Sequence, residues 1–372
     1  MMKVEIKMES LFSELWWMSM VFSVTTAVLL YLYLTWTHNY WSKRGVPYLK
    51  PKLIFGSLKD HIIGKKTLGQ VYQDCYRELE GHPFGGIFKF RQPVVLLRDP
   101  ELMKNVLVKE FASFQDNDFH SNVDVDPLWK EQRSKLTPAF TTGKLKPVFP
   151  LIEEVCNDLM EHLRENAKMD EDIAAQALTF FTDGYETSST ALTTLLHGLA
   201  INQTAQARLR EEVDAALASN GGKMNLDMIQ SMEYVDMALK EALRMYPVLP
   251  YMNRLCTKPF ELPLSDGKTV TVEVGTPVVT PILGIHYDPE YFPEPEKYEP
   301  ERFTEENKAK RPKYIHFPFG EGPRICLGMK FAQAQIKACV TSILSEFEIK
   351  PTDETPKLLT PVPTAFMIPL QK

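Results

Sequence analysis

A continuous apolar stretch without charge, proline or glycine runs from Leu15 to Trp36, close to the start of the chain. As a helix rising about 1.5 Å per residue it would be about 33 Å long, enough to cross the hydrocarbon core of a bilayer. Its tryptophans and tyrosines gather near the two ends, where aromatic rings prefer the lipid–water boundary. A cleaved signal peptide is the alternative, but the apolar run is too long and no small-residue cleavage site follows it. The pattern predicts a membrane-spanning helix over about 15–36.

Basic residues follow this stretch, among them Lys43 and Arg44, whereas the short leader before it mixes acidic and basic side chains. The positive-inside tendency then places the rest of the chain on the cytosolic side of the membrane. The basic, proline-containing residues 37–52 are typical of a stiff linker held near an anionic leaflet. We therefore divide the chain into a leader and anchor (1–36), this linker, and one folded domain (53–372).

After the anchor, the apolar pattern switches between the period of strands and the period of helices. One hairpin is predicted over 84–99, turning around Arg91-Gln92-Pro93, and another at Asp266-Gly267. Asp99 and Pro100 then supply an N-cap and a first-turn proline for a short helix. The apolar spacing predicts longer helices over 147–166, 170–199, 203–218, 231–246 and 328–346. The fold class is mainly α (α+β), with small sheets beside dominant helices.

The composition fits a large folded domain, because 44% of the 372 residues are hydrophobic and 24% are charged. These proportions exclude collagen-like, low-complexity and wholly disordered classes. A net charge of −6 argues against a protein that binds nucleic acid through an overall positive field. Five cysteines, odd in number and widely spaced, do not form a secreted disulfide framework. The bulk of the chain is expected to be intracellular.

The stretch from Phe319 to Gly328 is the most informative for chemistry, because Gly320, Gly322, a proline, an arginine and Cys326 come directly before a predicted helix. The glycines and the proline favour a tight loop. Backbone N–H groups and the positive end of the helix dipole would stabilise a thiolate at Cys326, which suits it to ligating a metal. A buried, inert thiol is the usual alternative, and we expect it of the remaining cysteines. These are Cys75, Cys156, Cys256 and Cys339.

This loop resembles the cysteine loop of the cytochromes P-450, haem-thiolate monooxygenases, of the membrane-bound eukaryotic type. Their loop has the form Phe-x-x-Gly-x-Arg-x-Cys-x-Gly, and the fixed positions are matched here by Phe319, Gly322, Arg324, Cys326 and Gly328. The family's Glu-x-x-Arg and Pro-Glu-Arg-Phe elements precede the loop in the same order. They are matched by Glu241, Arg244 and the stretch 300–303.

The resemblance implies a cytochrome P-450 fold and haem b, with Cys326 as the axial ligand of its iron. It assigns Trp129, Arg133, Arg254 and Arg324 to the haem propionates, and it makes Phe319, Gly322 and Gly328 part of the haem site. Glu241, Arg244 and Arg302 become a structural trio beneath the haem, and their spacing lets the first two share a helix face.

Dioxygen chemistry is assigned by the same resemblance to the predicted helix over 170–199. Gly184 in mid-helix costs about 1 kcal/mol relative to alanine, so it needs a packing or functional reason. The family widens this helix to admit dioxygen, and Glu186 and Thr187 would then organise protons for its cleavage. Asp183 stands where the family often has a small residue. The alternative is a polar helix face on which the Thr187 hydroxyl bonds to its own backbone.

Partners follow from the resemblance as well. It implies electrons from NADPH through a cytochrome P-450 reductase, a lipophilic small-molecule substrate, and a single-pass anchor in the endoplasmic reticulum membrane, with the catalytic domain cytosolic. Nucleic acid is not expected as a partner. We expect the reductase to dock around Cys326, although solvated lysines without a partner are the alternative. The lysines expected to take part are Lys130, Lys135, Lys330 and Lys337.

The resemblance is interrupted at two places. Residues 126–128 run directly into Trp129, where the family has a loop and a short helix that line the pocket. Between Met169 and Asp170 the chain lacks the pair of helices that normally roofs the pocket. Two functions therefore stay open. The chain is either a working monooxygenase, or a haem-binding remnant from exon skipping or gene decay that lacks coupled turnover.

Overall fold

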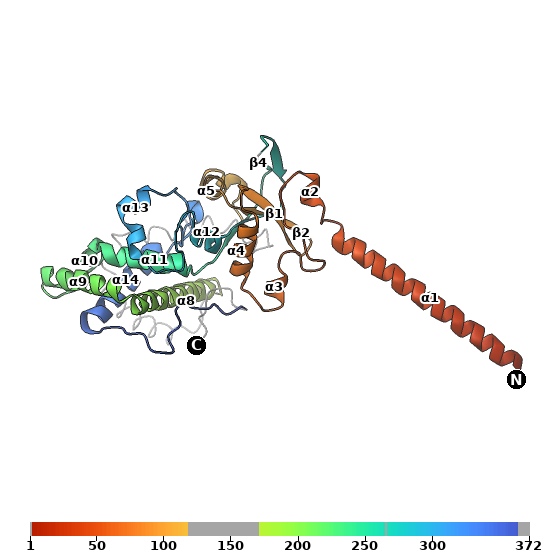
Figure 1. The fold of residues 1–372 in the computed structure, drawn as a ribbon, viewed down its shortest axis with the longest axis horizontal. Coiled ribbons are helices and arrows are strands. Elements are labelled where there is room, and N and C mark those ends of the chain that lie inside the picture. The colour runs from red at the N-terminus through yellow and green to blue at the C-terminus, as the bar shows by residue number, and fades with distance from the viewer. Residues whose placement is uncertain (1, 118–170, 265, 364–372) are drawn as a thin grey trace.

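The computed structural model describes residues 2–117, 171–264 and 266–363 (Figure 1). Its first half holds α1 (Met2–Thr35), α2 (Tyr40–Lys43), α3 (Lys59–Ile62), α4 (Leu68–Glu78), α5 (Pro100–Lys104), the π-helix η1 (Asn105–Lys109) and the 3-10 turn η2 (Phe111–Ser113). Its second half holds α8 (Glu171–Ile201), α9 (Gln203–Ser219), α10 (Leu226–Ser231), α11 (Glu233–Met245), α12 (Ile282–His286), η4 (Pro300–Phe303), α13 (Glu305–Ala309), η5 (Gly322–Arg324) and α14 (Met329–Glu346). The strands are β1 (Phe84–Lys89), β2 (Gln92–Leu97), β3 (Met252–Leu255), β4 (Phe260–Pro263), β5 (Thr269–Val272) and β6 (Pro277–Thr280).

A four-stranded sheet with the order β1-β2-β6-β3 joins the two halves of the chain. β1 and β2 form the predicted antiparallel hairpin, and β2 pairs in parallel with β6 through Val95 and Leu96. β3 completes the sheet antiparallel to β6, while β4 and β5 form a separate antiparallel pair. The sheet therefore places β6, from the second half of the chain, between β2 of the first half and β3.

Both predicted hairpins and the described long helices are confirmed, with boundaries shifted by at most a few residues. The first hairpin turns at Phe90 and Arg91, and Pro93 lies inside β2, rather than in the turn as the pattern predicted. Pro93 is tolerated there because only β1 pairs with that end of β2. Asp99 accepts a hydrogen bond from the Leu102 N–H at 2.9 Å and so caps α5 as expected. The helix predicted over 147–166 lies outside the described residues.

Two hydrophobic cores support these elements. The first surrounds the four-stranded sheet and includes α4 and α12. The second is helical and lies between α8, α9, α11 and α14. Large apolar side chains that leave water stabilise a fold by about 1.5–3 kcal/mol each, so the two cores together hold the framework on which the candidate site is built. The chain is thus mainly helical with small sheets, as the pattern predicted.

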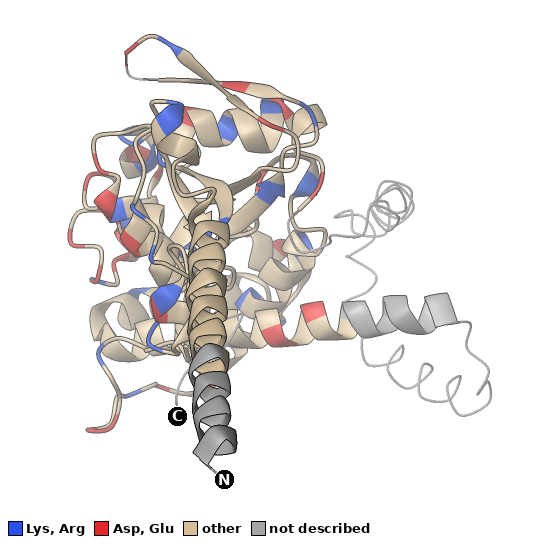
Figure 2. Ribbon diagram, turned by 90° about the vertical axis from the view of Figure 1, so that its right-hand side faces the viewer, with Lys and Arg blue, Asp and Glu red and all other residues tan. Residues whose placement is uncertain are grey.

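α1 projects away from the folded body (Figure 1). Its segment Leu15–Thr35 has a mean hydropathy of 1.7, is not buried against the rest of the chain, and is long enough to cross a bilayer. Figure 2 views the molecule from the side on which α1 departs and shows the apolar segment of this helix, Leu15–Thr35, as uncharged. Length, apolarity and exposure therefore all agree with the predicted anchor.

The stretch 37–52 packs onto the sheet rather than forming a free spacer. Trp41 is buried, and its indole N–H donates to the carbonyl oxygen of Ile87 at 3.2 Å. Gly86 lets the ring approach this closely, because a Cβ there would lie 2.3 Å from it. Tyr48 pairs with the same part of β1. The expected stiffness of this stretch therefore comes from its packing as well as from its prolines.

Candidate functional site

The cysteine loop folds back on itself before α14. The Cys326 N–H donates to the carbonyl oxygen of Phe319 at 2.8 Å, and the Ile325 N–H donates to that of Gly322 at 3.0 Å. Gly320 and Gly322 have φ angles of +78° and +74°, in the left-handed region that favours glycine. These bonds leave the Cys326 side chain exposed, just ahead of the first turn of α14.

Gly322 is also required by a close approach of two backbones. A Cβ at this position would lie 2.0 Å from the carbonyl oxygen of Leu107 in η1, which no side chain could tolerate. The π-helical geometry of η1 widens the helix by one residue per turn, and such widened turns often occur at functional sites. The loop that presents Cys326 is thus fixed against η1 by the one residue type that fits there.

Gly328 and Gly184 differ from Gly322 in this respect. Gly328 caps α14 with a φ of −84°, and a Cβ at Gly328 or at Gly184 would meet no atom within 4 Å. Within the described residues, packing alone therefore gives no reason for glycine at these two positions. Both glycines match the motifs of the resembled family, in which glycine at these positions leaves space for a bound ligand.

Two arginines predicted for the haem propionates converge near the loop. Arg254 in β3 is 7% exposed, and its guanidinium donates to the carbonyl oxygen of Asn253 at 2.9 Å. Its Nε has no hydrogen-bond partner, and no carboxylate among the described residues forms an ion pair with it. Burial, and then the positive charge of Arg324, lower the pKa of Arg254 to about 10. A buried cation that faces another cation is the arrangement that an anionic ligand would stabilise.

The other two predicted propionate ligands, Trp129 and Arg133, lie outside the described residues. The lysines Lys130 and Lys135 do so as well. Phe319 packs beside the helical core, at the start of the cysteine loop.

The α8 residues predicted for dioxygen chemistry lie on a largely exposed part of that helix. The Thr187 hydroxyl donates to the backbone carbonyl of Asp183, one turn earlier, which is the alternative arrangement considered from the sequence. Glu186 is exposed, and so are Phe181 and Tyr185, whose rings stack 5.9 Å apart at an interplanar angle of 4°. The polar groups of this helix are therefore present, but the described structure does not enclose them.

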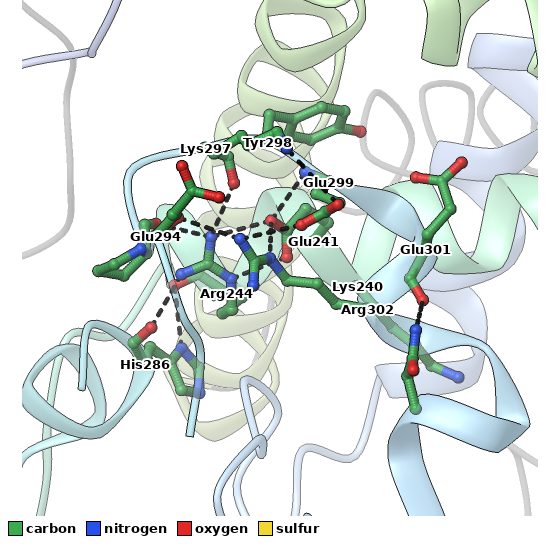
Figure 3. A network of polar contacts seen from close by, with 12 residues as sticks. Lys240, Glu241, Arg244, His286, Glu294, Lys297, Tyr298, Glu299, Glu301 and Arg302 are labelled. Atoms are coloured by element: carbon green, nitrogen blue, oxygen red, sulfur yellow. Dashed lines mark hydrogen bonds and ion pairs between the residues drawn. The ribbon is translucent and has the colours of Figure 1, made fainter. Parts of the chain in front are cut away.

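Glu241 and Arg244 meet as their spacing predicted, and Arg302 joins them as the resemblance implied (Figure 3). Glu241 and Arg244 on α11 are fully buried and form a two-pronged pair, with Nε–Oε2 at 2.8 Å and Nη2–Oε1 at 2.9 Å. Arg302 of η4 approaches the same carboxylate, with Nε 3.3 Å from Oε1. Such bidentate arginine–carboxylate pairs are among the stronger polar contacts, and they fix the geometry of both partners.

Backbone carbonyls complete this network. Arg244 donates to the carbonyl oxygens of His286 and Pro295, each at 2.8 Å, and Arg302 donates to that of Glu294 at 3.0 Å. The Glu299 N–H donates in turn to Glu241 at 3.0 Å. The network therefore ties α11 to α12, to the stretch 294–299 and to η4. Removing one partner would leave a buried charge without compensation, which costs about 3–5 kcal/mol.

Sequence reasoning did not find the histidines beside this network. His286 and His316 stack with ring centroids 5.2 Å apart, and each donates one ring N–H to a backbone carbonyl of α11. Burial lowers the pKa of His316 to about 3, and burial followed by the charges of His316 and Arg244 lowers that of His286 well below its usual value. Both rings are therefore neutral at physiological pH. No local spacing links residues that lie this far apart in the sequence.

Glu212 was also not anticipated. α11 has no side-chain cap of its own, and the Glu212 carboxylate of α9 accepts the N–H groups of Tyr234 and Val235 at 2.8 and 3.0 Å. A negative charge at a helix N-terminus is favourable, so α9 stabilises the helix that carries Glu241 and Arg244.

Two expectations are wrong. Lys337 is 7% exposed and forms an ion pair with Asp236 of α11 at 2.7 Å, so it joins α14 to α11 and is not presented to a partner. Lys330, one α14 turn from the cysteine loop, is exposed.

The second wrong expectation concerns a cysteine: Cys339 was expected to be buried but is exposed on α14. Cys75 and Cys256 are buried as expected, with thiol pKa values raised by burial, and Cys156 lies outside the described residues.

Comparison with known proteins gives a consistent result. The family model described as Cytochrome P450 matches residues 46–170 and 168–372. Similar relatives include cytochrome P450 6j1 of Blattella germanica, 30% identical over 92% of this chain and 94% of that protein. Cytochrome P450 9e2 of the same species is 28% identical over 94% and 95%, and cytochrome P450 6B7 of Helicoverpa armigera is 27% identical over 89% and 92%.

The lengths of these alignments differ from the length of the chain. The alignment to cytochrome P450 6j1 spans 476 positions, whereas this chain has 372 residues. That relative therefore holds more than a hundred residues without a counterpart here. The two parts matched by the family model meet at 168–170.

Proposed function

Since the chain belongs to the cytochrome P450 family of haem monooxygenases, we propose that it is a membrane-anchored member that oxidises a lipophilic small molecule. One oxygen atom of O2 enters the substrate, and the other leaves as water after taking up two electrons and two protons. The electrons come from NADPH through a partner reductase. The anchor α1 crosses the endoplasmic reticulum membrane, and the folded domain faces the cytosol.

The observation that carries this proposal is the cysteine loop together with the buried cation beside it. Cys326 is accessible at the end of a loop held by Gly322, and Arg254 lacks a counter-charge among the described residues. These residues fit a haem, whose iron would be held by the Cys326 thiolate and whose propionates would be held by Arg254 and Arg324. Bound haem supplies the activation of dioxygen.

The remaining residues serve the reaction through position and protons. Thr187 and Glu186 on α8 would hold and move protons, once the Thr187 hydroxyl turns from the Asp183 carbonyl. Gly184 leaves space on the same helix, because a Cβ there meets nothing within 4 Å. The Glu241 network holds α11 and η4 in place beneath the site, and it contributes through rigidity rather than contact with substrate.

The test is a carbon monoxide difference spectrum of the reduced protein in membranes. The native chain should give the thiolate-type band, and Cys326→Ala should abolish it, because the thiolate is the ligand that produces this band. Cys339→Ala is the matched control, since Cys339 is also exposed and lies on α14. Survival of the band in Cys326→Ala, or its loss in Cys339→Ala, would show that the ligand is misassigned.

Reductase docking on the face around Cys326 is supported by the exposed Lys330 close to the loop. Steering by such a charge weakens as salt is added. Lys330→Glu should slow electron transfer at low ionic strength without changing haem content, and Lys350→Glu, at an exposed lysine beyond α14, is the control. Equal rates for both variants and the native chain would contradict docking at this face.

A second function, a haem-binding remnant without coupled turnover, is favoured by one specific observation. The family match breaks at 168–170, where the helices that roof the pocket would be expected, and the relatives are longer than this chain. The exposed stack of Phe181 and Tyr185 on the adjoining helix supports the same view. Without a roof, water reaches the site and electrons are lost to hydrogen peroxide. We therefore propose that this chain binds haem weakly and carries out the oxidation with poor coupling, so that most of its electrons end in hydrogen peroxide.

A further inference from the structure

A cavity of about 280 Å³ lies between α10 and α14, two helices that pack against each other. α10 lies toward the end of the folded body away from α1 (Figure 1). Pockets that bind small molecules usually have volumes of about 300–1,000 Å³, so this space suits a small ligand. We refer to it as the α10–α14 cavity. Its lining side chains are Ile229 and Gln230 of α10 and Lys330, Gln333, Ala334 and Lys337 of α14.

The cavity has a polar rim and an apolar floor. Its four α14 residues lie on one face of that helix, because they follow one another at intervals of three, four and seven positions. Gln230 and Lys330 are exposed and form the rim, whereas Ile229 and Ala334 are buried and form the floor. Leu226 of α10 packs with Ala334, which holds the two helices together at this point.

The charge that lines the cavity is positive. Its lining contains Lys330 and Lys337, and no carboxylate is found among the described residues that line it. The ammonium group of the buried Lys337 lies 2.7 Å from Asp236 of α11. The same carboxylate lies 2.5 Å from the ammonium group of Lys240, so it is shared by two positive charges. These three groups together carry one positive charge, which a further anion would stabilise.

The other polar groups of the cavity are also able to bind an anion. Gln230 and Gln333 each carry an amide group with two N–H donors, one on each helix. Lys330 is in the first turn of α14, where the helix dipole favours negative charge. Donors from both helices therefore surround the same space.

We propose that the α10–α14 cavity binds a small organic anion. The two lysines and the two glutamine amides would hold its carboxylate, and a short apolar body would rest on Ile229 and Ala334. An organic anion fits better than an inorganic one, because the floor offers apolar contact. A small molecule can reach the buried Lys337 inside the cavity, whereas the surface of a partner protein meets only the rim.

Occupancy of the cavity would also act on electron transfer. Lys330 belongs both to the cavity and to the face proposed above for reductase docking. A bound anion cancels part of the positive charge that steers the reductase, so docking would weaken. This consequence rests on the proposed function, but the anion site itself does not.

The test is a titration of the full chain in lipid nanodiscs with benzoate, and with benzamide as its uncharged counterpart. With isoleucine methyl groups labelled, and Ile229→Val used for assignment, the Ile229 methyl resonance reports binding inside the cavity. Benzoate should shift this resonance saturably, and benzamide should leave it in place. Lys330→Gln should weaken benzoate binding about fivefold, as for the loss of one exposed ion pair. Lys350→Gln, at an exposed lysine beyond α14, is the control and should leave benzoate binding unchanged.

An unshifted Ile229 resonance, an equal shift with benzamide, or equal benzoate affinity in Lys330→Gln and the native chain would overturn the proposal. The rate of electron transfer from the reductase at low ionic strength gives a second readout, and it should fall as benzoate fills the cavity. If the Ile229 resonance shifts but electron transfer keeps its rate, the anion site stands and docking at Lys330 is contradicted. The two failures are thereby distinguished.

Discussion

The network around Glu241 and the exposed face of α8 both present polar and aromatic groups, but the fold encloses only the first. Arg244 and Glu241 are fully buried and bonded on every side, whereas Phe181 and Tyr185 are each 69% exposed. The cysteine loop belongs with the enclosed region, because Gly322 seats it against η1. Among the described residues, the region beneath the cysteine loop is thus enclosed, and the face of α8 that carries Phe181 and Tyr185 is exposed. Membership of the family alone does not tell which of these two regions the fold encloses and which it leaves exposed.

The largest expected effect comes from breaking the enclosed region. Arg244→Ala leaves the buried Glu241 carboxylate with a single weaker cationic partner, Arg302. The free energy of unfolding should fall by about 3–5 kcal/mol, and the variant should retain little haem. Urea unfolding and haem content check this. Arg208→Ala is the control, because the Arg208–Glu301 pair is largely exposed and should cost about 1 kcal/mol or less. Equal losses of unfolding free energy in the two variants would show that the Glu241 network stabilises the fold no more than an exposed ion pair does.

Gly322→Ala tests the cysteine loop. The new Cβ would clash with the Leu107 carbonyl oxygen at 2.0 Å, so the loop must move at a cost of about 1–3 kcal/mol. We expect a weakened thiolate-type carbon monoxide band as Cys326 shifts. Gly222→Ala, beyond α9, is the matched control, because its φ of +77° imposes a similar backbone strain while its Cβ position is open. A normal band in Gly322→Ala would mean that the loop does not depend on this contact.

Much of the framework could be predicted from local sequence. The apolar period located α8, α9, α11 and α14, because each buries one face in the helical core. The cysteine loop could be recognised because its turn requires glycine at positions with positive φ, such as Gly320 and Gly322, and these glycines stand at fixed distances from Cys326 in the sequence. Contacts between distant segments gave no such signal. The Glu212 cap of α11 joins residues more than twenty positions apart, and Lys337 looked like any helix-surface lysine until its Asp236 partner was seen.

The stacked histidines make the enclosed region sensitive to acid. The folded pKa of His316 is about 3, below the usual value of 6.5, so the unfolded chain takes up a proton first as the pH falls. The stabilising contribution is complete above pH 6.5 and is lost progressively as the pH falls toward 3. At pH 5 the loss for this one group is about 2 kcal/mol.

Urea unfolding at pH 7 and pH 5 measures this loss. His316→Gln keeps a neutral donor for the Lys240 carbonyl, so its stability should fall less over the same interval. His61→Gln is the control, because His61 is only partly buried, whereas His316 lies beside the Glu241 network. An identical pH dependence in the His316 variant and the native chain would contradict the assignment.

The smallest effect on the free energy of unfolding is expected from changes on the exposed face of α8. Phe181→Ser and Tyr185→Ser should change the free energy of unfolding by no more than about 0.5 kcal/mol, because neither ring is enclosed. In a chain given a roof segment between Met169 and Asp170 from a longer relative, the same changes should each cost about 1.5–3 kcal/mol. A large loss in the native chain would mean that this face is already covered.

The central question is whether a site with the α8 face exposed allows coupled turnover. The direct measurement is the ratio of hydrogen peroxide formed to NADPH consumed, with the full chain in membranes and a partner reductase present. We predict a ratio near one for the native chain and a clearly lower ratio after a roof segment is inserted between Met169 and Asp170. Low peroxide and stoichiometric oxygenated product from the native chain would contradict the account and show that the site is closed without those helices.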